Sequence, residues 1–154
     1  MSSIAKDNLA SQVQKHGVAF AYGSSVFVRE LLAKVKAGFP SPAEDLGHKR
    51  IDLTARLIKN PASTFLMRAS GESMREAGIF DGDVLVVDRS VRPRSGQVVI
   101  AVLDGEFVCK TLSLRAGRMK LKAANPGFAD IVPKDSQTVE IWGVVVNTIK
   151  SFPS

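Results

Sequence analysis

The sequence is poor in the residues that most often bind metals, form disulfides or act as catalytic bases. It has a single cysteine, Cys109, so no disulfide can form within the chain, which favours a reducing, cytoplasmic setting. Its two histidines, His16 and His48, lie far apart. We therefore expect neither a histidine-based metal site nor a Ser-His-Asp triad, and we predict no metal and no other cofactor.

Long apolar runs are also missing. No stretch approaches the roughly 18–20 apolar residues that span a bilayer. Residues 1–7 lack the basic and then apolar pattern of a signal peptide, so we expect a cytoplasmic protein with no membrane partner. Aromatic residues make up only 6% of the 154 residues, so aliphatic side chains must fill the core of what should be one domain with an arm.

The larger part of the chain has the pattern of an all-β domain. From Thr64 onward, short apolar runs are separated by Gly, Pro and Asp turns. Asp104-Gly105, between two such runs, favours a type I′ hairpin turn. Because strands do not alternate with helices, we expect a mainly β fold, a compact, twisted and mostly antiparallel sheet. Strands are predicted over about 64–69, 84–88, 97–103, 106–113, 118–123 and 139–150.

The N-terminal part is patterned differently. Residues 26–35 have enough helical periodicity for a short docked helix. Pro40 and Pro42 keep the chain around them extended. A short helix is predicted over 52–59, with Asp52 as its N-cap. The chain is thus expected to divide into a flexible N-terminal arm over 1–37, a linker with a short helix over 38–63, and a β domain over 64–154.

Two side chains have unusual settings. Ser73 lies in a turn of small residues, 69–74, directly after an apolar run. Lys110 lies within 106–112, a run that otherwise has the apolar character of a buried strand. Taken singly, such a serine is usually structural, and such a lysine usually protects a sheet edge or reaches water. Taken together, a turn hydroxyl and an amine among apolar neighbours are the groups that Ser-Lys peptide-bond hydrolysis needs.

The apolar setting of Lys110 gives that chemistry a physical basis. A lysine amine with its ordinary pKa of about 10.4 is protonated at neutral pH and cannot accept a proton. Burial disfavours the cation and lowers the pKa, so the amine could take the Ser73 proton and return it to a leaving amine. The backbone N–H groups of Glu72 and Ser73 are the candidates for an oxyanion hole.

A possible substrate lies in the same chain. Ala37-Gly38 presents little side-chain bulk to an attacking hydroxyl, and the prolines after it hold the chain extended. On its own this segment reads as a plain linker.

Several segments, in this order, resemble the UmuD/LexA family of self-cleaving proteins: 37–42, 65–74, 78–88, 104–110 and 139–146. The separation between Ser73 and Lys110 is also similar to that family's. The resemblance implies that Ser73 is the nucleophile, Lys110 the general base and Ala37-Gly38 the scissile bond.

The family that the chain resembles has two branches. LexA-type repressors carry a helix-turn-helix before the cleavage site, and residues 1–37 lack that pattern. The chain therefore resembles the UmuD branch, which acts in the SOS response. There, a RecA filament on single-stranded DNA stimulates self-cleavage, and the trimmed homodimer joins a UmuC-type polymerase for error-prone translesion synthesis. Three alternatives remain: a LexA-like regulator, an interaction module that does not cleave itself, and signal-peptidase-like processing of other proteins. The sequence also leaves open whether cleavage takes place in cis or in trans.

The remaining features have less specific interpretations. The formal net charge is +6, and Arg118, Lys120 and Lys122 alternate with apolar residues, so a strand there would place the three cations on one face. Such a face is either a solvated outer surface or a contact for phosphate or an acidic partner. Cys109 should lie on the strand face opposite Lys110 as a small buried hydrophobe.

Overall fold

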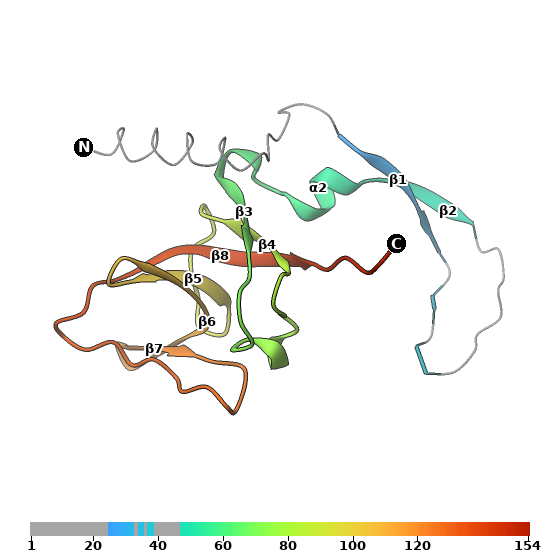
Figure 1. Ribbon diagram of the computed structural model, residues 1–154. Coiled ribbons are helices and arrows are strands. Elements are labelled where there is room, and N and C mark those ends of the chain that lie inside the picture. The colour runs from blue at the N-terminus through green and yellow to red at the C-terminus, as the bar shows by residue number, and fades with distance from the viewer. Residues whose placement is uncertain (1–24, 33, 36, 39–46) are drawn as a thin grey trace. The chain divides into compact units, whose positions relative to one another are not determined.

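The computed structural model describes residues 25–32, 34–35, 37–38 and 47–154 (Figure 1). Its contacts divide the chain into two units, Met1–Leu53 and Thr54–Ser154, which are described separately. Most of the predicted arm, and the prolines that follow Gly38, lie outside the described residues. Within the described residues, no helix is both long enough and apolar enough to cross a membrane.

The first unit contains a β-hairpin where a helix and a linker were expected. Strand β1 (Phe27–Leu31) pairs antiparallel with β2 (His48–Asp52), with Phe27 opposite Asp52. The prediction of a helix over 26–35 was therefore wrong. β-branched and aromatic residues at the start of this run lose side-chain freedom in a helix, and the partner strand supplies the backbone hydrogen bonds that a helix would have formed internally.

The helix predicted over 52–59 is present but shorter. Helix α2 (Leu53–Leu57) follows β2 directly, so Asp52 is the last residue of that strand. A 3-10 turn, η1 (Pro61–Ser63), then leads into the second unit's sheet.

The second unit is built on an antiparallel six-stranded sheet, which confirms the predicted fold class. All six predicted strands are present within two residues of their expected bounds. The Asp104-Gly105 turn has positive φ at both residues, 50° and 84°, as a type I′ turn requires. In sheet order the strands are β3 (Thr64–Arg68), β4 (Val84–Asp88), β8 (Val139–Ile149), β5 (Val98–Leu103), β6 (Glu106–Arg115) and β7 (Arg118–Lys122), with β3 and β7 at the edges (Figure 1).

Strand β8 is central to this unit because it pairs with both β4 and β5. Gly143 on β8 faces Val87 so closely that a Cβ there would come within 2.6 Å of Val87 Cγ1. Only glycine allows this approach, since Val87 is fully buried and cannot move aside. Two apolar clusters, one around Leu85 and Ile100 and one around Leu112 and Leu121, form the core.

A buried carboxylate, Asp88, fastens the end of β4 to η1. Its oxygens accept hydrogen bonds from Asn60 Nδ2 (2.7 Å), Ser63 Oγ (2.9 Å), Ser90 N (2.8 Å) and Ser90 Oγ (2.7 Å). Burial by itself raises the pKa of this carboxyl, but the hydrogen bonds outweigh it and lower the pKa from 3.8 to about 2. The charged form is therefore the one that the fold stabilises.

Replacing this carboxylate should make the protein less stable and change its response to acid. The stabilisation by Asp88 is fully present above about pH 4, the unfolded pKa, and is lost as the pH falls through about 2. We expect Asp88→Ala to lower the free energy of unfolding by about 2–4 kcal/mol at pH 7 and by less at pH 2. Urea unfolding at both pH values tests this, with Asp135→Ala at an exposed turn as the control. An equal loss at both pH values would contradict it.

Candidate active site

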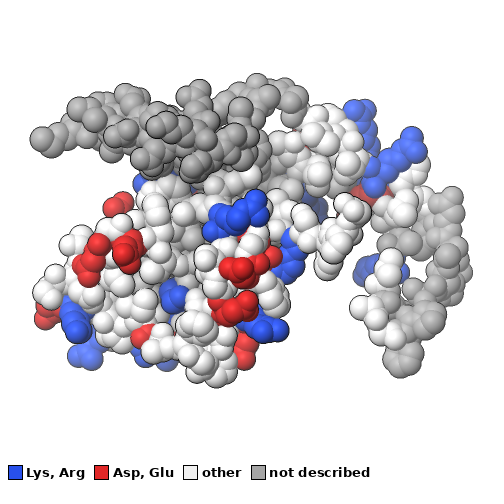
Figure 2. All heavy atoms as spheres, viewed as in Figure 1, with Lys and Arg blue, Asp and Glu red and all other residues white. Residues whose placement is uncertain are grey.

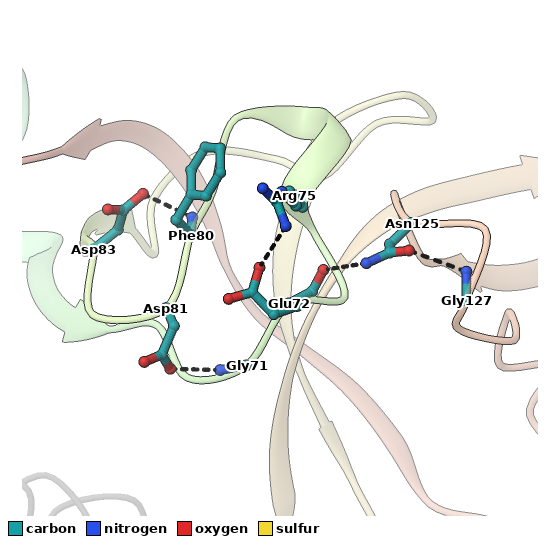
Figure 3. A network of polar contacts seen from close by, with 8 residues as sticks. All are labelled: Gly71, Glu72, Arg75, Phe80, Asp81, Asp83, Asn125 and Gly127. Atoms are coloured by element: carbon teal, nitrogen blue, oxygen red, sulfur yellow. Dashed lines mark hydrogen bonds and ion pairs between the residues drawn. The ribbon is translucent and has the colours of Figure 1, made fainter.

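Ser73 lies in the loop that joins β3 to β4, and hydrogen bonds close this loop at its base. Ala69 N donates to Asp83 O (2.8 Å), and Gly82 N donates to Ala69 O (2.9 Å). Further along, Gly71 N donates to Asp81 Oδ1 (2.8 Å), as Figure 3 shows. The chain therefore turns back on itself and presents residues 70–76 as one defined loop.

Lys110 reaches this loop from the middle of β6, which is flanked by β5 and β7. Its Nζ lies 2.7 Å from Ser73 Oγ and also donates to Cys109 O at 3.1 Å. Both side chains are half-buried. The structure thus brings together the two residues that the sequence singled out, at a distance that allows direct proton transfer between them.

Burial shifts the pKa values at this site in opposite directions. Desolvation lowers the pKa of Lys110, and the charge interaction with Cys109 opposes that shift without cancelling it. Desolvation raises the pKa of Cys109 to about 11, so this thiol stays neutral at physiological pH. Cys109 packs against the cluster around Ile100, as expected for a small hydrophobe, but it is only partly buried.

The backbone on either side of Ser73 is held by the segment that follows β7. Asn125 Nδ2 donates to Glu72 O (2.9 Å), and Ala124 N donates to Ser73 O (2.8 Å). Within the described part of the chain, the N–H groups of Glu72 and Ser73 have no acceptor. They remain the candidates for stabilising an oxyanion. The sequence did not point to Asn125, because Asn125-Pro-Gly has the composition of an ordinary turn.

The predicted scissile bond belongs to the first unit, whereas Ser73 and Lys110 belong to the second. Ala37 and Gly38 are both exposed, and a Cβ at Gly38 would meet no atom within 4 Å. Within the first unit, the Ala37–Gly38 peptide bond is therefore exposed, and neither of its two residues has a bulky side chain.

The other charged residues have simple settings. Arg118, Lys120 and Lys122 are exposed on the edge strand β7, while Leu121 between them is buried, so the predicted alternation is present. On the face drawn in Figure 2, basic and acidic side chains are interspersed rather than gathered into separate fields. Among the described residues, no group of three or more His, Cys, Asp or Glu side chains is arranged to bind a metal ion.

The fold and the site together define a class of protein: an antiparallel β domain that holds a serine hydroxyl against a partly buried lysine amine. A model of the Peptidase S24-like family matches residues 30–146, and the chain belongs to this family of self-cleaving serine peptidases. This confirms the resemblance to LexA- and UmuD-type proteins at the level of the family.

Several curated relatives cover most of the chain. Protein ImpA of Escherichia coli is 43% identical over 136 residues, which is 87% of this chain and 92% of ImpA. Protein MucA of Escherichia coli is 40% identical over 123 residues, 79% of this chain and 84% of MucA. The LexA repressor of Xylella fastidiosa is 38% identical over 120 residues, 78% of this chain but only 56% of the repressor. These relatives support a function of the LexA/UmuD type.

Proposed function

We propose that the protein cleaves its own chain at Ala37-Gly38, with Ser73 as the nucleophile and Lys110 as the general base. The observation that carries this proposal is the 2.7 Å contact between Lys110 Nζ and Ser73 Oγ, made by an amine whose pKa burial lowers. A neutral amine has one lone pair and two hydrogens. It can therefore accept the Ser73 proton while still donating to the Cys109 carbonyl.

The reaction then runs in two halves. Ser73 Oγ attacks the Ala37 carbonyl carbon as its proton passes to Lys110 Nζ, and the Glu72 and Ser73 N–H groups stabilise the oxyanion. The intermediate collapses with cleavage of the C–N bond, and Lys110 gives its proton to the departing Gly38 amine. Lys110 then takes a proton from water, which attacks the Ser73 ester, and Lys110 returns that proton to Ser73 Oγ as the ester C–O bond breaks. The products are residues 1–37 with a free carboxylate and a chain that begins at Gly38.

In the cell, we place this cleavage in the SOS response. A RecA filament on single-stranded DNA stimulates it, and the trimmed chain forms a homodimer that serves a UmuC-type translesion polymerase as an accessory subunit. An aromatic patch provides a surface for the second copy: Phe107 is 52% exposed and packs edge-on against Trp142, with ring centroids 5.6 Å apart. The exposed Arg118, Lys120 and Lys122 fit a phosphate or an acidic partner.

Intact mass spectrometry of the purified chain tests the proposal. We expect incubation at pH 10, or with RecA, an ATP analogue and single-stranded DNA, to yield a fragment that begins at Gly38. Ser73→Ala should stay whole under both conditions, while Ser70→Ala, in the same loop, should still be cut. Cleavage in Ser73→Ala would overturn the assignment of the nucleophile. An uncut wild-type chain under both conditions would favour an interaction module that does not cleave itself.

A further inference from the structure

The segment after β7 holds both peptide groups next to Ser73. Asn125 Nδ2 donates to Glu72 O at 2.9 Å, and the preceding residue, Ala124, donates its N–H to Ser73 O at 2.8 Å. Ala124 O in turn accepts from Glu76 N at 2.7 Å. Ala124 and Asn125 therefore hold the carbonyls of Ser73 and Glu72, respectively. The contact from Ala124 is made by its backbone, and the contact from Asn125 is made by its side chain.

Fixing the Glu72 carbonyl also fixes the direction of the Ser73 N–H. The two groups belong to one peptide unit, and in a trans peptide the C=O and the N–H point to opposite sides. The described residues contain no cis peptide bond. Because the Glu72 oxygen faces Asn125, the Ser73 N–H faces away from it, and no acceptor among the described residues takes that N–H.

Asn125 is itself held in the orientation that this contact needs. Its Oδ1 accepts a hydrogen bond from Gly127 N at 3.0 Å, which leaves Nδ2 to face the Glu72 carbonyl (Figure 3). Arg75 N also donates to the Glu72 carbonyl, but this hydrogen bond is longer, at 3.3 Å. The hydrogen bond from the Asn125 side chain is therefore the shorter of these two, which together orient the Glu72–Ser73 peptide plane.

We infer that Asn125 is a positioning residue for self-cleavage: it orients the Glu72–Ser73 peptide so that the Ser73 N–H can stabilise the oxyanion. This inference rests on the proposed function. Asn125 acts through the backbone, and among the described residues the hydrogen bonds of Lys110 Nζ go to Ser73 Oγ and Cys109 O rather than to Asn125. Its loss should therefore slow the reaction without changing the pH at which the amine titrates.

The test compares two matched variants of the full-length chain. Asn147 Nδ2 also donates to a backbone carbonyl, Leu57 O, at 2.8 Å and is also half-buried, but it lies outside the Ser73 loop. We expect Asn125→Ala to lower the first-order rate of self-cleavage at pH 10 by about 10- to 100-fold, because small misplacements of catalytic groups cost about this much. Asn147→Ala should stay within about twofold of the wild type.

Two further measurements separate positioning from simple loss of stability. Tm is recorded for both variants, and rates are compared at a temperature at which circular dichroism shows each to be folded. The pH midpoint of the rate should be the same in Asn125→Ala and the wild type. If Asn125→Ala does not fold, Asn125→Asp replaces it, since aspartate keeps the acceptor for Gly127 but cannot donate to Glu72; it too should be slow.

The outcomes distinguish this inference from the function on which it rests. If the wild type is cut, Ser73→Ala is not, and Asn125→Ala is cut as fast as Asn147→Ala, the positioning role is wrong and the proposed function stands. A shifted pH midpoint in Asn125→Ala would also overturn it, because Asn125 would then be acting on the amine. If the wild type is not cut at pH 10 or with the RecA filament, the proposed function fails and this inference fails with it.

Discussion

Replacing Lys110 with methionine is expected to lower the rate of self-cleavage by at least about a thousandfold, a loss typical of removing a general base. Methionine has nearly the length of lysine and fills the same half-buried space, but it has no basic nitrogen. Without the amine 2.7 Å from its oxygen, the Ser73 hydroxyl has no other hydrogen-bond partner among the described residues that could take its proton. The residual reaction would depend on solvent hydroxide alone. Intact mass measured over time at pH 10 gives both rates.

The same substitution should leave the fold intact or make it more stable. The lowered pKa of Lys110 shows that its surroundings disfavour the charged form, and a thioether carries no such cost. We therefore expect a Tm no lower than that of the wild type. Lys134→Met, at an exposed position before β8, is the matched control and should cleave at the normal rate. If Lys110→Met cleaves as fast as this control, Lys110 is not the base.

A second variant, Lys110→Arg, distinguishes a role for the positive charge of Lys110 from a role for its neutral amine. Arginine keeps the positive charge but does not release its proton in the accessible pH range, so it cannot act as a base. A mechanism that needs only a cation beside Ser73 would survive this change. A mechanism that needs a neutral amine would not, and we expect no cleavage.

The sequence was a good guide to the sheet because short-range chemistry sets its turns. Asp104-Gly105 has the backbone freedom that a type I′ turn needs, and that turn sets the pairing of Leu103 with Glu106. The apolar run before Ser73 and the turn of small residues around it placed the serine after a strand in the same way. Such features are decided within a few residues, so the sequence carries them directly.

Pairing between distant segments was not predictable in this way. The run 26–35 forms a strand because His48–Asp52 lies beside it, and nothing in the run itself indicates that partner. Asn125 is likewise 53 positions from Glu72, and its local sequence indicates only a turn. Lys110 was predictable only in part. Its apolar neighbours marked it as unusual in the sequence, but its contact with Ser73 depends on the folded sheet, which brings the amine to the hydroxyl.

The rate of self-cleavage without an activator is expected to rise steeply with pH and then level off. Only the neutral amine can accept the Ser73 proton, so well below the pKa of Lys110 the rate should rise about tenfold per pH unit. Burial lowers that pKa, so the midpoint should fall below the ordinary lysine value of about 10.4. First-order rates measured by intact mass between pH 7 and pH 10.5, on protein shown to be folded throughout, give this profile.

Cys109 is the other group near the amine that titrates at high pH, and it can be separated from Lys110. Burial raises the pKa of the thiol to about 11, so Cys109 stays neutral over most of the measured range and cannot produce a rise that begins near pH 7. Cys109→Ala should therefore keep the steep rise. Because the charge interaction with Cys109 opposes the lowering of the Lys110 pKa, the midpoint in this variant should be equal or slightly lower. A rate that stays flat from pH 7 to pH 10 would contradict the neutral-amine mechanism. A rise that disappears in Cys109→Ala would assign the titration to the thiol.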